Sequence, residues 1–320
     1  MALYLGIDGG TVKTTAIAAN DQGKILAKTV GGSIDYKNIG LSQARKNLKM
    51  IVNQLLMKTE EKYFSCVCIG SSSLNSRATT RETENLISGI IDTDHAILDS
   101  SIFTAMQCMT ESGPCALVIS GINSMVAARN EKGKITKAGG WGHMFGDEGS
   151  GFIIAMEAIR YCIRAFEGSE PPTTMLEDML EFFDIYSPQE LPDRIFDIET
   201  QKSKISSFAG RVFSCASAGD VAAKEIIKKQ AYLLAGTTKA LIKDLPKDLA
   251  VGLWGGVFVN NRRFRNKFSE AMSELSPDYR IEVLNYPAEC GALFAAFKHD
   301  GIEITDVVTK NIDLYRGVRV

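Results

Sequence analysis

Residues 3–25 read LYLGIDGGTVKTTAIAANDQGKI, and residues 116–135 read ALVISGINSMVAARNEKGKI. Each stretch has an apolar run, a glycine turn, a second apolar run and an Asn-x-x-Gly-Lys-Ile turn, a pattern that predicts two strands joined as a hairpin. Asn20 and Asn130, which open the two Asn-x-x-Gly turns, lie 110 residues apart. We infer two related α/β domains that face each other, not a short-period repeat. The alternative, that two hairpins share only common turn chemistry, stays open.

The rest of the chain alternates between strands and helices. Apolar residues at helical spacing predict amphipathic helices, and short apolar runs closed by turn residues predict strands. The predicted strands are 64–70, 96–98, 116–120, 125–129 and 250–254, and the predicted helices are 41–57, 150–166, 174–184, one capped by Asp220, and a final one at 289–298. Because no long stretch contains strands alone, the fold class is α/β.

Length and charge set the domain count and exclude several partners. A chain of 320 residues usually splits into two domains, which we place at 1–118 and 119–320, with the last helix free to pack back on the first domain. A net charge of −2 argues against nucleic-acid binding. We find no apolar run of about 18 residues and no positively charged leader, so we expect no membrane span and a globular protein of the cytoplasm.

The cysteines agree with a reducing compartment. Their number, seven, is odd, and no CxxC pair occurs, which argues against a secreted disulfide framework. Cys66 and Cys68 would share one face of a strand, a spacing that suits a metal, but their apolar run favours burial in the core. The chain has only three histidines, so a structural zinc site has few ligands to draw on.

Three glycine turns that follow strands suit an anionic ligand. They contain Gly9-Gly10, Gly121 and Gly255-Gly256. Glycine lets backbone N–H groups approach a polyphosphate closely. None of the turns is a Walker loop or a GxGxxG motif, and for each a purely structural turn is the alternative. The first turn is the strongest candidate because Asp8, at the strand end, can hold a hydrated Mg²⁺ against phosphates.

Two further segments carry groups that could bind or activate a substrate. Residues 139–151 read GGWGHMFGDEGSG and combine six glycines with Trp141 and two adjacent acids, a mixture that suits a polyhydroxylated ligand. Asp99 follows the apolar run 96–98 at the carboxyl end of a strand, where open α/β sheets bind ligands. Its carboxylate could accept the proton of an attacking hydroxyl. The alternative is that Asp99 caps the helix that starts at Ser101, and both roles are compatible.

These motifs, in this order, resemble the N-acetylglucosamine kinase family, a branch of the BadF/BadG/BcrA/BcrD ATPases in the actin, hexokinase and Hsp70 superfamily. The match is most specific at 139–151, and 208–210, 216–220 and 287–292 also follow the family's order. The resemblance implies an actin-like ATPase fold of two duplicated ribonuclease-H-like domains with an interdomain cleft, which closes around sugar and nucleotide.

The resemblance also implies roles for individual residues. Asp99 corresponds to the general base, and Asp8 to the residue that organises Mg²⁺ through water, with ATP as the phosphoryl donor. The implied sugar-binding residues are Asp35 (usually asparagine in the family), Gly140, Trp141, Gly142 and Asp147. The implied nucleotide-binding residues are Gly9, Gly10, Thr11, Lys13, Gly121, Ser124, Ala216, Gly255 and Gly256.

Two positions depart from the family pattern. Val12 stands where a phosphate-binding threonine is expected, and Ile122 replaces a second threonine. Each lost hydrogen bond to phosphate would be worth about 1 to 1.5 kcal/mol, so we expect weaker nucleotide binding or slower transfer. Thr11 and Ser124 are candidates to substitute.

The leading prediction is therefore an ATP-dependent kinase for a hydroxyl of an amino sugar, N-acetylglucosamine or a related N-acetylhexosamine such as N-acetylmuramic acid. A weak or non-catalytic sugar-binding regulator is one alternative, although no helix-turn-helix precedes Leu3. An ATPase activator of an acyl-CoA dehydratase is another, although residues 139–151 replace the Gly-Gly-Gln-Asp signature that activators resemble. We expect small-molecule partners only, with a homodimer left open.

Overall fold

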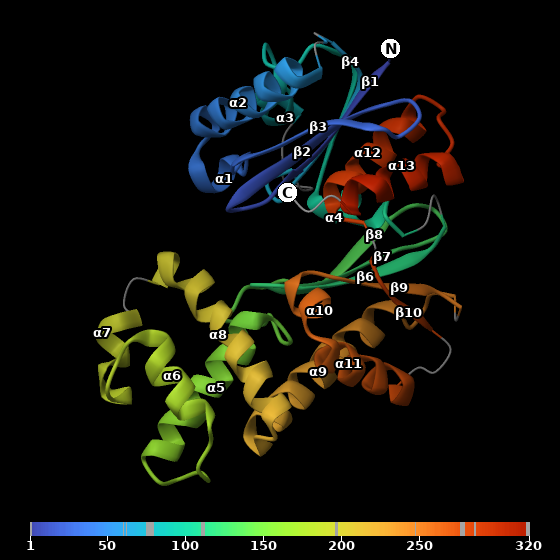
Figure 1. Cartoon of the computed structure of the whole chain (residues 1–320). Helices are drawn as coiled ribbons and strands as arrows, with labels where there is room; N and C mark the ends of the chain where they lie inside the picture. Colours follow the sequence, from blue (N-terminus) through green and yellow to red (C-terminus); the bar gives the residue numbers. More distant parts are fainter. Residues whose placement is uncertain are drawn as a thin grey trace. The chain divides into compact units, whose positions relative to one another are not determined.

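The chain divides into two units, one comprising Met1–Glu111 and Leu284–Val320 and the other Ser112–Val283 (Figure 1). The computed structural model describes residues 2–59, 61, 63–74, 80–109, 113–195, 198–246, 248–275, 279–284 and 286–317. The predicted division between residues 118 and 119 differs from this one, because it falls inside the strand Cys115–Ser120. The chain after residue 283 returns to the first unit, where its helices pack on the first sheet.

The first unit is built on a five-stranded mixed sheet in the order β3-β2-β1-β4-β5. Strands β1, β2 and β3 are antiparallel neighbours, whereas β4 and β5 run parallel to β1. The strands are β1 Leu3–Gly9, β2 Lys13–Asn20, β3 Ile25–Gly32, β4 Phe64–Ser71 and β5 Thr93–Asp99. The helices are α1 Tyr36–Ile39, α2 Leu41–Thr59, α3 Thr80–Ile87, α4 Ser101–Met106, α12 Ala288–His299 and α13 Asp306–Gly317.

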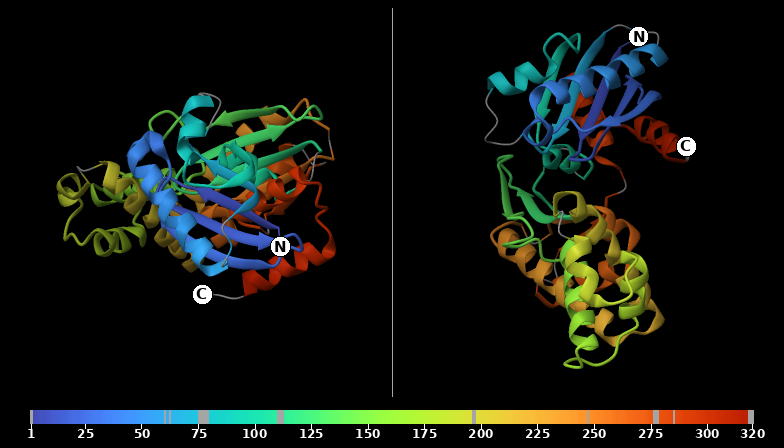
Figure 2. Two further views of the ribbon diagram at one scale, coloured as in Figure 1. Left: turned by 90° about the horizontal axis from the view of Figure 1, so that it is seen from above. Right: turned by 90° about the vertical axis from the view of Figure 1, so that its left-hand side faces the viewer.

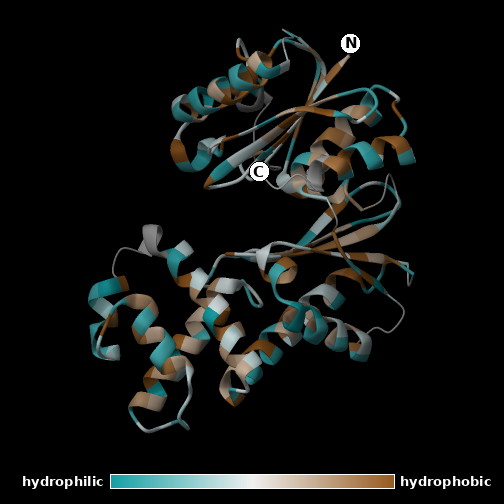
Figure 3. Cartoon of the chain, in the orientation of Figure 1, coloured by the Kyte–Doolittle hydropathy of each residue, from teal (hydrophilic) through white to brown (hydrophobic). Residues whose placement is uncertain are grey.

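Alternating side chains on β1 bury the two faces of this sheet in different apolar layers. Leu5 and Ile7 join a cluster with α2, whereas Tyr4 joins a cluster with α12. This alternation is the period of two expected of a strand. Figure 2 shows α2 on one face of the sheet and α12 with α13 on the other, and Figure 3 shows both brown and teal residues along α2. Asp8 has the parity of Tyr4 and therefore lies on the α12 face.

The second unit contains a second five-stranded mixed sheet, in the order β10-β9-β6-β7-β8. Its strands are β6 Cys115–Ser120, β7 Ser124–Arg129, β8 Ile135–Gly139, β9 Ala250–Trp254 and β10 Arg280–Val283. Its helices are α5 Gly151–Phe166, α6 Met175–Phe183, the 3-10 helix Pro188–Glu190, α7 Leu191–Ile195, α8 Ile198–Ala218, α9 Val221–Ile242, α10 Gly256–Asn260 and α11 Arg262–Leu275. Among the described residues of both units, no helix combines the length and the apolar character needed to cross a membrane.

The two sheets repeat one topology, which confirms the duplication predicted from the two hairpins. In each sheet the first three strands are antiparallel neighbours, and the last two run parallel to the first. The repeated turns also match in detail. The Oδ1 atoms of Asn20 and Asn130 each accept hydrogen bonds of 3.0 to 3.1 Å from the N–H groups two and four residues later.

The predicted strands and long helices are confirmed, except for the prediction of which helix is the last. Asp220 caps α9, because its Oδ1 accepts a hydrogen bond from the N–H of Ala223 at 2.9 Å. The prediction that residues 289–298 form the final helix is wrong, since α13 follows. Only Val308 and Ile312 of α13 are buried among its described side chains, which makes its apolar periodicity weak. Several elements were also not predicted, from the short α1 and β10 to the strand β3 and the long helices α8 and α11.

Candidate active site

Two of the predicted functional acids lie in one row of the first sheet. The strand register pairs Asp8 of β1 with Gly70 of β4, and Gly70 with Asp99 of β5. Both carboxylates therefore lie on the α12 face, with Cα atoms about 10 Å apart, which is two strand spacings. A Cβ at Gly70 would lie 2.4 Å from Oγ1 of Thr104, so only glycine fits between the acids. This row is at the carboxyl ends of the parallel strands.

Asp8 lies close to a second acid. Burial, followed by the charge of Glu289, raises the pKa of Asp8 to about 7, while the charge of Lys13 and a hydrogen bond from Ser101 lower it. Glu289 is in the first turn of α12, and burial raises its pKa as well. Burial thus opposes the ionisation of both carboxyl groups. A bound cation would offset their negative charges, so this pair is a candidate cation site.

The carboxylate of Asp99 is held by its neighbour. Its Oδ1 accepts hydrogen bonds from the backbone N–H of Ser100 at 2.5 Å and from the Ser100 hydroxyl at 3.1 Å. Within the described chain these bonds reach only Oδ1, which leaves Oδ2 for a ligand. The alternative reading, that Asp99 caps α4, does not hold, because Ser100 Oγ accepts a hydrogen bond from the N–H of Phe103 at 3.3 Å and is the cap.

Two hydrogen bonds fix the first glycine turn, which follows Asp8. The N–H of Gly10 donates to the carbonyl of Lys13 at 3.0 Å, and the hydroxyl of Ser33 donates to the carbonyl of Gly10 at 2.8 Å. Thr11, Val12 and Lys13 are exposed, and Val12 is 72% exposed. The turn therefore presents one hydroxyl, one ammonium group and one apolar side chain to solvent.

Asp35 is linked to the same turn through Ser33, and one of its carboxylate oxygens has no hydrogen-bond partner among the described residues. Its N–H donates to Oγ of Ser33 at 3.0 Å, and its Oδ2 accepts the hydroxyl hydrogen of Ser72 at 2.7 Å. Asp35 is 6% exposed, and its Oδ1 has no hydrogen-bond partner among the described residues. Burying an acceptor without a partner costs free energy, so this oxygen is a candidate ligand contact.

The second glycine turn, in the second unit, is fixed by its own hydroxyls. The N–H of Gly121 donates to the carbonyl of Asn123 at 2.9 Å. Ser120 and Ser124 each donate a hydroxyl hydrogen at 2.7 Å to carbonyls of the glycine-rich segment 139–151. The hydroxyl hydrogen of Ser124 is therefore engaged in holding the fold. This side chain is buried at the start of β7, and the phosphate contact predicted from the sequence stays a prediction.

A lysine that the sequence analysis did not identify reaches this second turn. Lys202 of α8 donates from Nζ to Oδ1 of Asn123, and the same Nζ lies 3.9 Å from Oδ2 of Asp147. It also lies 5.6 Å from the centre of the Phe152 ring. Lys202 therefore places a positive charge between the second glycine turn and the glycine-rich segment.

A pocket of about 480 Å³ opens beside the second glycine turn. It is lined by Gly121, Ile122, Gly151, Ser203, Ser206, Ser207, Ala209, Gly210, Phe213, Gly256, Val257, Asn260 and Asn261. Gly255 lies next to it with a φ of 104°, and a Cβ there would lie 2.3 Å from the carbonyl oxygen of Ser120.

The structure places Ala216 outside the lining of this pocket. Ala216 has no exposed surface and belongs to the core of the second unit. The lining residues Phe213 and Ala209 precede it by three and seven residues. These spacings put all three on one face of α8, and Ala216 lies where that face is packed in the core. Ala216 therefore does not line this pocket, whereas Ala209 and Phe213 of the same helix do, and its contact with the nucleotide stays a prediction.

The glycine-rich segment contains one exposed aromatic residue and one buried acid among the predicted ligands. Trp141, between Gly140 and Gly142, is 75% exposed. Asp147 is 1% exposed, has a left-handed φ of 66°, and neither carboxylate oxygen has a hydrogen-bond partner among the described residues. Burial raises its pKa, and the charge of Lys202 opposes this shift. A buried carboxylate on a strained backbone, with a lysine nearby but no hydrogen-bond partner among the described residues, is typical of a ligand-binding position.

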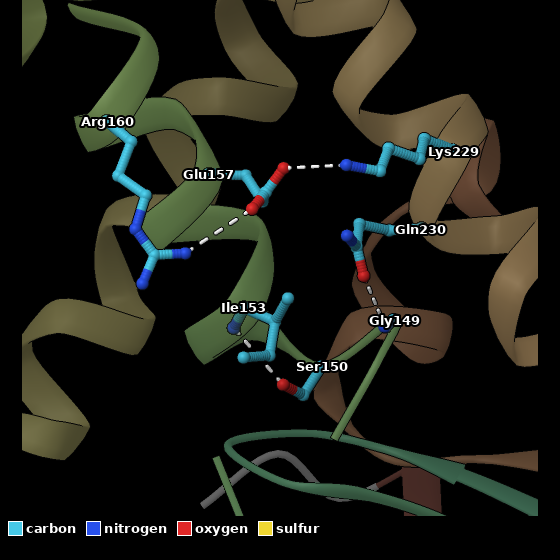
Figure 4. A network of polar contacts seen from close by, with 7 residues as sticks. All are labelled: Gly149, Ser150, Ile153, Glu157, Arg160, Lys229 and Gln230. Carbon is cyan, nitrogen blue, oxygen red and sulfur yellow. Dashed lines mark hydrogen bonds and ion pairs between the residues drawn. The ribbon is translucent and has the colours of Figure 1, made fainter. Parts of the chain in front are cut away.

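Two helices hold this segment in place (Figure 4). The side-chain oxygen of Gln230, from α9, accepts the N–H of Gly149 at 2.8 Å. Ser150 caps α5, and further along α5 Glu157 is 3.0 Å from Nζ of Lys229. The backbone on the carboxyl side of Asp147 is therefore tied to both α5 and α9, which preserves its strained conformation.

Three of these positions were missed from the sequence. Glu289 lies in the segment 287–292. The available signal was its position shortly after Pro287, at the start of a helix. Ser72 and Lys202 gave no signal, because each meets its carboxylate partner only through the tertiary fold.

Comparison with known proteins places these features in a family. A sequence profile of the BadF/BadG/BcrA/BcrD ATPase family matches residues 5–297, so the chain belongs to that family. The N-acetylmuramic acid/N-acetylglucosamine kinase of Clostridium acetobutylicum is 26% identical over 301 residues, which cover 92% of this chain and 98% of the relative. The N-acetyl-D-glucosamine kinase of Dictyostelium discoideum is 25% identical over 258 residues, covering 77% and 81% respectively.

A solved structure has the same fold. The protein from Chromobacterium violaceum assigned as an N-acetylglucosamine kinase superposes with a TM-score of 0.74 and 18% identity, covering 92% of this chain and 98% of its own. The two-unit α/β architecture predicted from the sequence is therefore also the fold of this solved structure.

Proposed function

We propose that this protein is a kinase that transfers the γ-phosphoryl group of ATP to a hydroxyl of an N-acetylated amino sugar, N-acetylglucosamine or N-acetylmuramic acid. The observation that carries the proposal is the row of Asp8 and Asp99 at the carboxyl ends of β1 and β5. The family membership and the names of two relatives that match most of the chain support the same reaction and substrate class.

Asp99 is the proposed general base. Ser100 holds Oδ1 with two hydrogen bonds, so Oδ2 can accept the proton of the sugar hydroxyl as its oxygen bonds to phosphorus. The bond between phosphorus and the oxygen of ADP breaks in the same transfer. Phosphoryl transfer depends mainly on positioning and charge neutralisation, so one carboxylate aimed at one hydroxyl is enough.

Asp8 is the proposed anchor for Mg²⁺, and the residues present fit this ion. Asp8 and Glu289 are neighbouring acids whose ionisation is opposed by burial, and their oxygens are of the kind Mg²⁺ prefers. When bound with ATP, the ion would neutralise phosphate charge. Lys13, on the exposed first turn, supplies a second positive charge near Asp8.

The nucleotide contacts are proposed for the two glycine turns and the pocket beside the second one. Gly9, Gly10 and Thr11 would face phosphate in the first turn. Gly121 and Gly256 line the 480 Å³ pocket, and Gly255 fixes its edge. Val12 and Ile122 offer phosphate only their backbone, and the Ser124 hydroxyl is engaged elsewhere, so we expect weak binding of ATP.

The sugar contacts are proposed for Asp35, Asp147 and the segment Gly140–Gly142. Both acids are buried and have oxygens without partners among the described residues, and sugar hydroxyls are donors that would satisfy them. Trp141 offers an exposed flat face against which a sugar ring can pack.

An ADP-release assay across hexoses, hexosamines and their N-acetyl forms tests the proposal. We expect turnover with N-acetylglucosamine or N-acetylmuramic acid, and its loss in Asp99→Asn. Asp94→Asn is the matched control, because Asp94 is on the same strand and belongs to no proposed site. Background rates with every sugar would contradict the proposed function.

A sugar-binding regulator is the second candidate, favoured by the apolar side chains at Val12 and Ile122. Calorimetry distinguishes the two, since a regulator would bind sugar but would not bind ATP.

A cytoplasmic location is also proposed, supported by seven free cysteines. The homodimer stays a prediction.

A further inference from the structure

The helix α12 has chemically different surroundings at its two ends. At its start, Glu289 lies near Asp8 and the row of acids. At its other end, His299 and the capping residue Asp300 come close to Cys66 on β4. These ends are about 15 Å apart, given ten residues of helix at 1.5 Å each. The second end is therefore separate from the proposed catalytic groups.

The ligand atoms at this second end are already gathered. One potential ligand atom each from Cys66, His299 and Asp300 lie within 4.8 Å of one another. Nδ1 of His299 is 3.1 Å from Oδ1 of Asp300. Two ligand atoms on one tetrahedral zinc ion are separated by roughly 3.3 to 3.8 Å, given bonds of about 2.0 to 2.3 Å. Small side-chain adjustments would bring all three atoms onto one ion.

Neighbouring groups orient two of the three ligands. The strand register pairs Cys66 with His95 of β5, and the His95 ring packs on the His299 ring with centres 4.6 Å apart. Tyr4 makes a side-chain hydrogen bond with Asp300. Hydrogen-bonded and packed outer groups of this kind are typical around metal ligands. Two of the three histidines of the chain thus meet here, although the sequence suggested few ligands for zinc.

The local charge also suits a cation. The site lies at the carboxyl end of α12, where the helix dipole makes the environment negative. Thiolate, imidazole and carboxylate together form the donor set that suits zinc better than magnesium or calcium, which prefer oxygen alone. The side chains of His299 and Asp300 are 41% and 20% exposed, so an ion can enter from solvent.

We propose that Cys66, His299 and Asp300 bind one Zn²⁺ ion, with the fourth coordination position open to water. Binding would release the proton of the Cys66 thiol to solvent. The ion would join β4 to the end of α12, two segments of the first unit that lie more than 200 residues apart in the chain. Its role would be to hold the returning C-terminal segment on the first sheet.

Zinc binding is measured on tag-free full-length protein, stripped with a chelator and titrated with Zn²⁺ against a chromophoric competitor. We expect one tightly bound equivalent in the wild type and at least a tenfold weaker affinity in Cys66→Ala and His299→Ala. Cys68→Ala and His143→Ala are the controls, because they remove a buried thiol of the same strand and an imidazole that belongs to the second unit. Controls that lose zinc equally, or a wild type that binds none, would overturn the proposal.

A second measurement covers the case in which Cys66→Ala does not fold. Co²⁺ added to the stripped wild type should give a thiolate-to-cobalt absorption band, and added Zn²⁺ should raise the melting temperature. His299 is partly exposed, so His299→Ala should fold and lose both effects. Absence of the cobalt band in folded wild type would contradict ligation by Cys66. None of these readouts depends on kinase activity.

Discussion

The two repeats share one topology, yet they differ at the residue just before the first glycine of the turn that follows the first strand. In the first unit, Asp8 precedes Gly9; in the second, Ser120 precedes Gly121. Asp8 keeps a carboxyl group beside Glu289, whereas the Ser120 hydroxyl is used to hold the glycine-rich segment at 2.7 Å. The same strand and turn pattern therefore supports a charged site in one repeat and a structural contact in the other. Pattern sets the fold, and single residues at strand ends set the chemistry.

The largest effect is expected at Asp99, the proposed general base, which belongs to the first repeat. Asp99→Asn should lower kcat by about 10²- to 10⁴-fold, because a positioned base contributes on that order. Sugar binding, measured by calorimetry, should be largely kept. Unchanged kcat in this variant, with Asp94→Asn as the reference, would remove Asp99 from the role of base.

Replacing Asp8 should separate function from stability. The pKa of Asp8 is raised from 3.8 to about 7, so ionisation destabilises the folded state progressively as pH rises from about 4 to about 7. At pH 8, the free energy of unfolding of Asp8→Asn should therefore exceed that of the wild type by at most about 4 kcal/mol. Near pH 3 the two proteins should be equally stable. Its phosphoryl transfer should be slower at every pH. A variant that is less stable than the wild type at pH 8 would show that the Asp8 carboxylate stabilises the fold.

The two turns should respond alike to the missing hydroxyls. Val12→Thr and Ile122→Thr should each lower the KM for ATP about five- to tenfold, equivalent to about 1 to 1.5 kcal/mol of added hydrogen bonding. Val12→Ala is the control, since it changes the side chain without adding a donor. If Val12→Ala lowers KM as much as Val12→Thr, the added hydroxyl is not the cause.

The smallest effect concerns the feature that the repeats share. Asn20→Ala and Asn130→Ala each remove an acceptor of two backbone hydrogen bonds, at a cost of about 1 kcal/mol in unfolding free energy. The two losses, measured by urea denaturation, should be similar. A large difference between the two losses would mean that the two turns contribute differently to the free energy of unfolding despite their matching geometry.

Much of the fold could be predicted because it depends on local patterns. The alternation around Leu5 and Ile7, and the paired Asn-x-x-Gly turns, indicate a strand hairpin that recurs in each domain. The return of α12 and α13 to the first unit could not be predicted in detail, because it depends on packing between segments far apart in the chain. The short helix α1, with only Tyr36 buried, has too little apolar periodicity to predict.

The candidate site divides in the same way. Asp8 and Asp99 lie at strand ends of the first sheet, so the edge that these two acids share could be inferred from the order of the elements. The glycine turns also follow strands, each in its own sheet. The partners that tune them, Glu289 for Asp8 and Lys202 for Asp147, come from other elements and required the fold. The burial of Ala216 could not be predicted, because helix position alone does not say which part of a helical face packs in the core.

The most direct test of the central claim follows both substrates at once. Phosphorus NMR of wild-type protein with ATP, Mg²⁺ and N-acetylglucosamine or N-acetylmuramic acid should show a sugar phosphate appearing together with ADP. The same mixture with Asp99→Asn should show neither above background. If ADP forms in the wild type without any sugar phosphate, or if Asp99→Asn produces the sugar phosphate at the wild-type rate, the account of this protein as an Asp99-dependent amino-sugar kinase is contradicted.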